Sequence, residues 1–291
     1  MAHRQALLVA LALSVLFASA TDGRQKFSSR TLGVRVDVLV IDGRNPIAGL
    51  KANDFELRDN GIVQRVEVVD SADVPINAVL ALDTSASITG KRKTDLVAAG
   101  EALIDGLKPV DRAALTTFSH AVTPAMALTS DFRAVREELK GIEPRGQTSV
   151  MDGVYVALTS TLEPSGRYLI VVCTDGTDTT SWLQPSEVLD AAQRANGVIY
   201  AVTASDSRRS SALKALSDST GGQMLQVKSS GELRSVFQRI LTEFRSRYVL
   251  VYSPENVSIG GFHRLEISVP RRRATVKART GYIGVEPQKQ P

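Results

Sequence analysis

The sequence predicts an α/β fold in which a mostly parallel sheet, flanked by helices, lies between two β segments. In the middle of the chain, short apolar runs alternate with segments that carry apolar residues at helical spacing, which is the pattern of βαβ units. On either side, apolar and polar residues alternate along short runs, as in strands with one buried face. Neither flank has enough strands for a robust sheet alone, so the two flanks are expected to pair with each other in a small β domain.

The first twenty residues have the features of a secretory signal peptide. A weakly basic start, His3 and Arg4, precedes the apolar stretch Ala6–Phe17, and Ala18-Ser19-Ala20 supplies small residues for cleavage. The apolar stretch is short for a transmembrane helix, and no other segment approaches that length. We therefore expect residues 1–20 to be removed and the mature chain, without a transmembrane segment, to be periplasmic or secreted. An uncleaved anchor is the alternative.

Composition indicates a globular protein and gives no support to nucleic-acid binding. Hydrophobic residues make up 43% and charged residues 23% of the 291 residues. Loss of the signal removes Arg4 and no acidic residue, so the net charge falls from +4 to +3, too little to indicate a nucleic-acid partner. The cluster Arg271-Arg272-Arg273 is expected to form a solvated hairpin turn, with a heparin or nucleic-acid patch as the alternative. Cys173 is the only cysteine, and we expect a buried thiol.

The elements divide the mature chain into three parts. Residues 31–70 are expected to be β structure, in which Asp59-Asn60-Gly61 predicts a tight hairpin turn, and residues 247–285 return to β structure. Residues 75–245 form the α/β part. Its predicted strands are 77–82, 113–118, 122–128, 168–173, 198–202 and 224–227, and its predicted helices are 95–107, 132–139, 150–162, 187–195, 211–217 and 232–244. The short turn between the second and third strands predicts an antiparallel edge.

Three polar loops in the α/β part carry oxygen side chains. Asp83-Thr84-Ser85-Ala86-Ser87 follows the mostly apolar run 76–82, Gly146-Gln147-Thr148 precedes a predicted helix, and Thr174-Asp175-Gly176 closes a later strand. In open α/β sheets, ligands bind at the carboxyl ends of the strands, where such loops gather. Carboxylate and hydroxyl oxygens are the ligands that hard divalent cations prefer. The loops are therefore candidates for a metal site, although Asp and Ser are also common in turns and helix caps.

The three loops, in this order, resemble the metal-ion-dependent adhesion site (MIDAS) of von Willebrand factor type A domains. The flanks extend the resemblance, because Asp54-Phe55-Glu56-Leu57-x-Asp59-Asn60-Gly61, Phe262-His263 and Arg279-Thr280-Gly281-Tyr282 are similar to the opening and closing motifs of VWFA-related proteins from acidobacterial genomes. The resemblance spans nearly the whole mature chain. It implies the doubly wound, six-stranded sheet of type A domains, with the metal site on the upper rim of the sheet.

The resemblance also implies a role for each residue of the site. The implied hydroxyl ligands are Ser85, Ser87 and Thr148, while Asp83 and Asp175 would hold metal-bound waters or coordinate directly. Gln147 stands where the family often has a second Gly. Mg²⁺ is the expected ion, with Mn²⁺ as an alternative, since Mg²⁺ favours octahedral oxygen coordination and keeps waters. An open position on the ion would accept an Asp or Glu from a protein partner.

We therefore expect an exported, metal-dependent protein-binding module of the adhesion type, and not an enzyme. Thr89-Gly90-Lys91 lacks the first Gly of a phosphate-binding loop, and no Gly-x-Ser-x-Gly elbow surrounds any serine. Two alternatives are a scaffolding protein of the cell envelope with a non-essential metal site, and a metal-assisted hydrolase.

The loop after Asp175 is the expected docking surface for the partner. It contains Thr177, Asp178 and Trp182, the only tryptophan of the chain. A Trp in a polar loop either packs against the next helix or stays exposed as a binding anchor, and interface hot spots are enriched in Trp.

Overall fold

The α/β part of the chain is built on a six-stranded sheet. The structure, a computed structural model, describes residues 33–71, 74–162, 165–203 and 211–284. The strands of this sheet are β6 (Ile76–Asp83), β7 (Arg112–Phe118), β8 (Val122–Thr129), β9 (Arg167–Thr174), β10 (Gly197–Thr203) and β11 (Gln223–Gln226). Their order is β11-β10-β9-β6-β7-β8, and every neighbouring pair is parallel except β7 with β8. The doubly wound, mostly parallel sheet and its antiparallel edge were both predicted, and both are confirmed.

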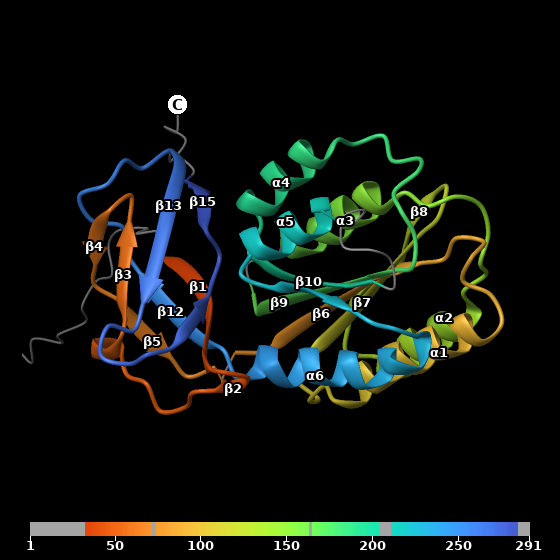
Figure 1. The fold of residues 1–291 in the computed structure, drawn as a ribbon, viewed down its shortest axis with the longest axis horizontal. Helices are drawn as coiled ribbons and strands as arrows, with labels where there is room; N and C mark the ends of the chain where they lie inside the picture. The colour runs from red at the N-terminus through yellow and green to blue at the C-terminus, as the bar shows by residue number, and fades with distance from the viewer. Residues whose placement is uncertain (1–32, 72–73, 163–164, 204–210, 285–291) are drawn as a thin grey trace, which may run out of the picture. The chain divides into compact units, whose positions relative to one another are not determined.

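Helices cover both faces of this sheet (Figure 1). They are α1 (Lys91–Asp105), α2 (Phe132–Gly141), α3 (Val150–Thr159), α4 (Pro185–Arg194), α5 (Ser211–Ser219) and α6 (Leu233–Arg245), with short 3-10 turns at Ala52–Asp54, Ser160–Leu162 and Ser230–Glu232. Helices α1, α2 and α6 share one apolar core with one face of the sheet, and α3, α4 and α5 share a second core with the other face. Because both faces are covered, β6 is buried along its whole length and its sequence is almost continuously apolar.

The sheet changes winding direction between β6 and β9. From β6 the chain proceeds through α1 to β7 on one side, and from β9 it proceeds through α4 to β10 on the other side. Such a switch point opens a crevice at the carboxyl ends of the two strands, because their following loops diverge. Asp83 ends β6 and Thr174 ends β9. The fold therefore places the first and third polar loops next to each other.

Strands from both flanks build two antiparallel sheets that share an apolar core. The strands are β1 (Val34–Asp42), β2 (Asn45–Pro46), β3 (Glu56–Asp59), β4 (Ile62–Gln64), β5 (Glu67–Val69), β12 (Tyr248–Tyr252), β13 (Gly261–Ser268), β14 (Thr275–Lys277) and β15 (Gly281–Gly284). One sheet has the order β14-β1-β12-β5, with β2 paired to β1, and the other has the order β15-β13-β3-β4. Strands from the N-terminal flank pair with strands from the C-terminal flank in both sheets. The turn between β3 and β4 has Asn60 at φ 48° and Gly61 at φ 82°, which confirms the predicted hairpin.

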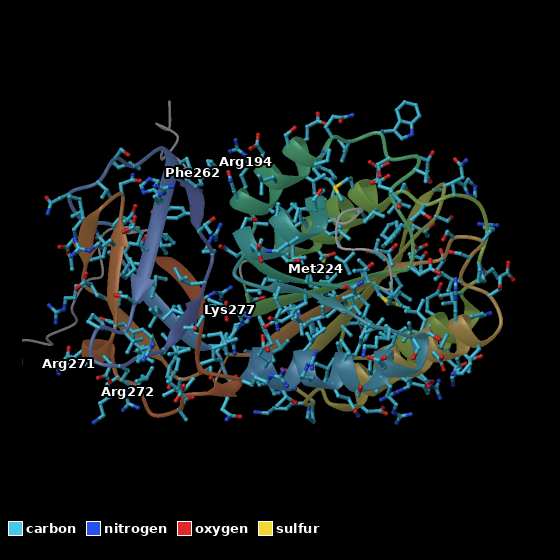
Figure 2. The ribbon with its side chains drawn as sticks, in the orientation of Figure 1. Arg194, Met224, Phe262, Arg271, Arg272 and Lys277 are labelled. Carbon is cyan, nitrogen blue, oxygen red and sulfur yellow. The ribbon has the colours of Figure 1, made fainter. Side chains whose placement is uncertain are left out.

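The expected hairpin at Arg271-Arg272-Arg273 is wrong. These residues are exposed, but β13 before them and β14 after them belong to different sheets, so the turn leads from one sheet to the other. Arg271 and Arg272 point away from the strands in Figure 2. A pattern of alternating residues identifies a strand but not its partner, and this is why the sequence suggested a hairpin.

Buried polar groups hold the flanking sheets together and join them to the α/β part. His263 Nδ1 lies 2.9 Å from Asp59 Oδ1, so this histidine links β13 to β3. Arg167, at the start of β9, donates to Asp37 Oδ1 on β1 at 2.6 Å and to the carbonyl oxygen of Phe244 at 2.9 Å. Arg247 donates to the carbonyl oxygen of the same Asp37 at 3.3 Å. Both arginines are almost fully buried, and their donors are satisfied across the boundary between the two parts.

The predictions for the N-terminal signal at residues 1–20 lie outside the described residues. Within the described residues, no helix has both the length and the apolar character needed to cross a membrane. Cys173 is buried and unpaired, as expected, and burial together with the nearby Asp83 and Asp175 raises the pKa of its thiol.

Candidate metal centre and docking loop

Asp83 anchors the site from inside the protein. Its side chain is fully buried at the end of β6. The carboxylate accepts the Ser85 backbone N–H at 2.8 Å and the Thr174 hydroxyl at 2.6 Å, so it ties the first polar loop to the end of β9. Burial raises the pKa of Asp83 above its ordinary value, because it disfavours the charged form, while the hydrogen bonds from Thr174 and Ser85 act in the opposite direction. A cation beside Asp83 would stabilise its charged form.

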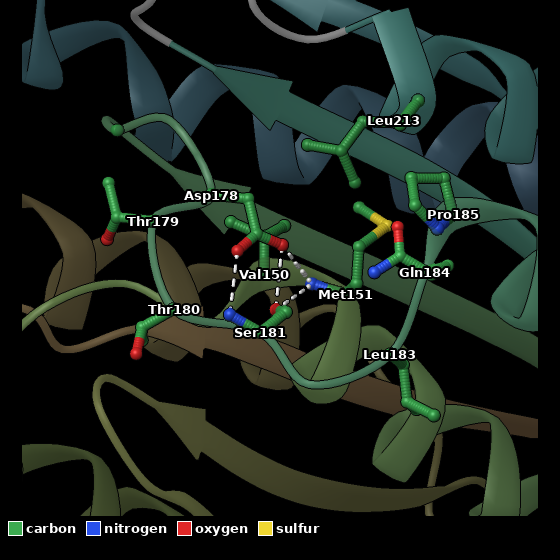
Figure 3. A pocket seen from close by; sticks show the side chains of 12 residues that line it. Val150, Met151, Asp178, Thr179, Thr180, Ser181, Leu183, Gln184, Pro185 and Leu213 are labelled. Carbon is green, nitrogen blue, oxygen red and sulfur yellow. Dashed lines mark hydrogen bonds between the residues drawn. The ribbon is translucent and has the colours of Figure 1, made fainter.

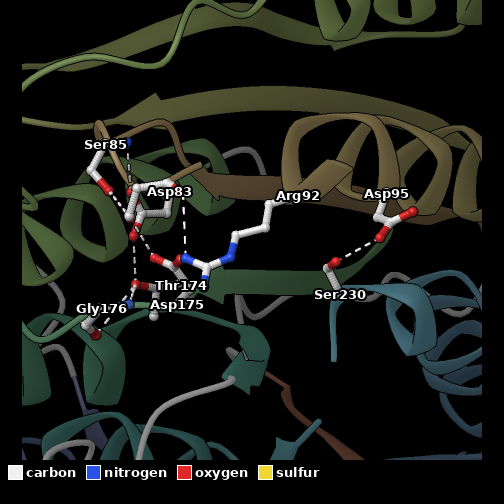
Figure 4. Close-up of polar contacts among 9 residues, drawn as sticks. Asp83, Ser85, Arg92, Asp95, Thr174, Asp175, Gly176 and Ser230 are labelled. Carbon is white, nitrogen blue, oxygen red and sulfur yellow. Dashed lines mark hydrogen bonds and ion pairs between the residues drawn. The ribbon is translucent and has the colours of Figure 1, made fainter. Parts of the chain in front are cut away.

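The two serines and Asp175 form a continuous chain of hydrogen-bonded oxygen atoms beside Asp83, of which Figure 4 labels Ser85 and Asp175. Ser85 Oγ lies 3.1 Å from Ser87 Oγ, and Ser87 Oγ donates to Asp175 Oδ1 at 2.7 Å. Alternate residues of the loop thus direct their hydroxyls to one place. Hydrogen bonds thus connect four of the five residues that the resemblance implies for the metal site: Asp83, Ser85, Ser87 and Asp175.

Thr148, the fifth residue, borders the same rim from the loop before α3. A Cβ placed on Gly176 would lie 3.4 Å from Thr148 Oγ1, so the threonine hydroxyl lies against the residue that follows Asp175. The loop is fixed to the first polar loop by two backbone hydrogen bonds, from Arg145 N–H to the Thr84 carbonyl at 2.8 Å and from Ala86 N–H to the Gly146 carbonyl at 3.0 Å. Three loops from distant parts of the sequence therefore meet at one edge of the sheet.

Gly146 has a positive φ of 71°. The imidazole ring of His120 lies directly against its backbone. A Cβ at this position would come within 2.1 Å of His120 Nδ1, so only glycine fits there. His120 is exposed and belongs to the turn between β7 and β8. The glycine that the loop requires is thus Gly146, whereas Gln147 is exposed and leaves the loop geometry undisturbed.

Arg92 is a further member of the site that the sequence analysis did not identify. It lies in the first turn of α1 and donates through Nη1 to Asp175 Oδ2 at 2.6 Å, and to the Ser87 carbonyl oxygen at 3.4 Å (Figure 4). The signal in the sequence was the basic run Lys91-Arg92-Lys93 at the start of a helix. Cations are unfavourable at a helix N-terminus, so such a run indicates that a nearby anion compensates it. Thr174 is a second such residue: it belongs to the Thr174-Asp175-Gly176 motif, and its hydroxyl donates to Asp83 at 2.6 Å.

The loop after Asp175 divides into an anchored part and an exposed part. Asp178 Oδ2 accepts the Met151 backbone N–H at 2.9 Å and the Ser181 hydroxyl at 2.7 Å (Figure 3), so this carboxylate caps the first turn of α3. Thr177 is exposed. The Trp182 side chain is 92% exposed, although its backbone N–H is held by Asp152 Oδ2 at 3.0 Å. Of the two alternatives for Trp182, packing against the next helix is therefore wrong.

A cavity of about 330 Å³ lies behind this loop, between the start of α3, the loop and α5 (Figure 3). Its wall combines apolar side chains, such as Val150 and Leu213, with the hydroxyl-bearing residues Thr179 and Thr180. The loop after Asp175 therefore borders a cavity of mixed polar and apolar character.

The donor set at the rim suits a hard divalent cation. The cluster has two carboxylates and hydroxyl oxygens, and no group of three or more His, Cys, Asp or Glu side chains that could hold a metal occurs among the described residues. A site with few charged ligands leaves most of the charge of an ion available to an outside ligand. The guanidinium of Arg92 already lies against Asp175, so the cluster is demonstrably complementary to positive charge.

Comparison with known proteins matches this geometry. The family model of the von Willebrand factor type A domain matches residues 77–239. No curated protein sequence matches the chain. A solved structure of von Willebrand factor type A from Catenulispora acidiphila has a TM-score of 0.53 at 13% identity and covers 84% of this chain and 76% of that one.

Two further solved structures share the fold. Proximal thread matrix protein 1 from the mussel byssus, solved with a zinc-occupied MIDAS motif, has a TM-score of 0.53 at 16% identity and covers 63% of this chain and 49% of that one. The minor pilin PilB from Streptococcus sanguinis has a TM-score of 0.50 at 12% identity, with 60% and 62% covered. The chain thus spans less than two thirds of each of these two proteins, and at such identities the likeness concerns the fold alone.

Proposed function

Because the chain belongs to the von Willebrand factor type A domain family, we propose that it is an exported protein-binding module whose rim holds a divalent cation that coordinates an acidic residue of a partner. The observation that carries this proposal is the convergence of Asp83, Ser85, Ser87 and Asp175 at the switch point between β6 and β9. The N-terminal signal that the sequence predicts supports export, and a minor pilin and a byssus protein share the fold.

In this proposal the residues of the rim have separate tasks. Ser85, Ser87 and Thr148 would provide hydroxyl ligands, and Asp83 and Asp175 would hold metal-bound waters or coordinate directly. The bound ion, Mg²⁺ or Mn²⁺, would supply a Lewis-acid position open to a carboxylate of the partner. Since the byssus protein holds zinc in its MIDAS motif, Zn²⁺ belongs in the same titration.

The docking surface extends from the ion to Trp182. The exposed indole stands on a loop whose backbone is fixed by Asp152, and Thr177 is exposed on the same loop. An exposed aromatic side chain on the loop that follows Asp175 would give a partner an apolar contact, and the ion would bind its carboxylate. Asp178 would contribute indirectly, since its carboxylate is engaged in holding the loop against α3.

A binding role is favoured over hydrolysis because neither carboxylate of the rim is free to act as a base. Asp83 accepts two hydrogen bonds and is fully buried. Asp175 accepts from Ser87 and from Arg92. A general base must reach the proton that it removes, and both carboxylates already accept hydrogen bonds from neighbouring protein groups.

The test is capture of a partner from envelope extract by the purified mature chain. We expect capture in Mg²⁺, and loss of capture in EDTA and in a Ser87→Ala variant assayed in Mg²⁺. Ser87 is exposed at the rim, so its loss leaves the core untouched. Equal capture in all three conditions would contradict the proposal and favour the scaffolding alternative, in which the flanking sheets make the contacts.

A further inference from the structure

We propose that Arg92 is a tethered competitor for the divalent ion, so that its guanidinium neutralises Asp175 in the ion-free site and the ion binds by displacing it. This inference rests on the proposed metal site and assigns to one residue the control of ion affinity. Arg92 would then set the ion concentration at which the rim becomes competent to bind a partner.

The contacts of Asp175 show why an ion and Arg92 cannot use this carboxylate independently. Oδ1 accepts the Ser87 hydroxyl at 2.7 Å, and Oδ2 accepts Arg92 Nη1 at 2.6 Å. Both oxygens are therefore engaged, one by a hydroxyl that belongs to the proposed ligand set and one by a permanent cation. Hydrogen bonds between two charged groups are about twice as strong as those between neutral groups. An ion that approaches Asp175, directly or through a water, must weaken the contact with Arg92.

Both side-chain hydrogen bonds of Arg92 lead to the site, one to Asp175 Oδ2 and one to the Ser87 carbonyl oxygen. Lys91, Arg92 and Lys93 occupy the first turn of α1, where the helix dipole disfavours positive charge. Lys91 is compensated within the helix by Asp95 at 2.7 Å. The ion pair of Arg92 is instead with Asp175, 83 residues away on the loop after β9. Arg92 therefore stabilises the charge of the site and not the start of its own helix.

Arg92 also has space to leave Asp175. Its side chain is 57% exposed, whereas that of Asp175 is 14% exposed, so the arginine is the mobile member of the pair. It borders a cavity of about 220 Å³ between α1, the ends of β9 and β10 and the start of α6. Displacement of the guanidinium therefore requires a change of side-chain rotamer and no unfolding of α1.

The opposite role for Arg92 would be to position Asp175 for the ion. The two roles predict opposite signs when the guanidinium is removed. A competitor weakens ion binding, so its removal increases affinity. A positioning residue supports ion binding, so its removal decreases affinity. The sign of the change in affinity therefore decides between them.

The experiment measures Mg²⁺ affinity by calorimetry at fixed ionic strength for wild type, Arg92→Met and Lys93→Met. Lys93→Met removes the same charge from the same helical turn without touching the contacts of Asp175, so it reports the general effect of lost positive charge. We expect Arg92→Met to bind Mg²⁺ about tenfold more tightly than Lys93→Met, which corresponds to the loss of one charge-assisted hydrogen bond. In proteins that also carry Asp175→Asn, Arg92→Met should no longer change the Mg²⁺ affinity.

The outcomes separate this inference from the proposed function. Equal affinities for Arg92→Met and Lys93→Met, or weaker binding by Arg92→Met, would overturn the role of Arg92 while the metal site stands. Binding by Arg92→Met but not by wild type would support the competition and contradict the proposal that wild type acts through the ion. Absence of Mg²⁺ binding in all three proteins would overturn both.

Discussion

Replacement of Asp83 by Asn should give a protein that is at least as stable as wild type without an ion and less stable than wild type with Mg²⁺. The fully buried carboxylate accepts the Ser85 N–H at 2.8 Å and the Thr174 hydroxyl at 2.6 Å. An Asn side chain retains an oxygen acceptor for Ser85 and places its amide against the Thr174 hydroxyl, which can rotate to accept. The substitution thus keeps the loop in place and removes only the negative charge.

Without an ion, the direction of the stability change caused by Asp83→Asn follows from the pKa of Asp83. Burial raises this pKa in the folded state, so the charged form is disfavoured by folding. A group of this kind contributes stability while it is protonated and loses that contribution as the pH rises through its folded pKa. At neutral pH, without an ion, we therefore expect Asp83→Asn to be at least as stable as wild type.

The sign reverses with the ion because only wild type gains binding free energy. At an Mg²⁺ concentration of about 100 times the Kd, one site stabilises the fold by about 2.7 kcal/mol. A domain of about 150 to 250 residues gains about 2 to 4 °C in Tm for each kcal/mol, which predicts a rise of about 5 to 11 °C for wild type. For Asp83→Asn we expect a rise below about 1 °C, since the charge that attracts the ion is gone.

The assay is thermal melting followed by circular dichroism in EDTA and in Mg²⁺, with Asp83→Ala as the contrast. Alanine leaves the Ser85 N–H and the Thr174 hydroxyl without their acceptor, at about 1 to 3 kcal/mol each. Asp83→Ala should therefore melt below wild type in both buffers. An Asp83→Asn variant that gains as much from Mg²⁺ as wild type, or that melts as low as Asp83→Ala in EDTA, would refute the reasoning.

Three further substitutions test the rim and the frame that supports it. Trp182→Ala should weaken partner binding by about 2 kcal/mol or more and leave Tm and Mg²⁺ affinity unchanged, because the side chain is 92% exposed; a lower Tm with intact capture would contradict this. Arg167→Leu leaves the buried Asp37 carboxylate unpaired and should reduce the free energy of unfolding by about 3 to 5 kcal/mol, with a loss below about 1 kcal/mol in urea titrations as the contrary result. Hydrogen bonds from Lys91 and Ser230 lower the pKa of Asp95. Asp95→Asn should therefore have a lower free energy of unfolding than wild type at neutral pH, and this difference should vanish as the pH falls through the lowered pKa; a difference that persists in acid would contradict the prediction.

The sequence predicted the α/β sheet well because the pattern that identifies its elements is local. The strands β6, β9 and β10 are buried along their whole length, and the helices show an apolar stripe within one or two turns. The start of α1 was less accurate, since the helix begins at Lys91 while the apolar spacing begins near Asp95. Polar residues fill the first turn, so the hydrophobic pattern contains no information about it.

The site was predictable to the level of loops but not of contacts. Asp83, Ser85, Ser87 and Asp175 could be proposed because oxygen side chains follow two strands that a parallel sheet brings together. The pairing of Asp175 with Arg92 depends on how α1 leaves its loop, which no local pattern encodes. The same limit applies to Asp178, which was expected at the partner surface but caps α3, 27 residues earlier in the chain.

One buried charged group at each end of the α/β sheet has a different degree of compensation by its neighbours. At the end that faces the flanking sheets, Arg167 is buried and fully engaged by Asp37 and the Phe244 carbonyl. At the rim, a buried carboxylate has a raised pKa and a tryptophan is 92% exposed. Folding alone gains nothing from either feature of the rim, and each would be relieved by an external ligand, the carboxylate by a cation and the indole by an apolar contact. A buried carboxylate with a raised pKa beside an exposed aromatic side chain therefore supports the proposed binding site at this rim.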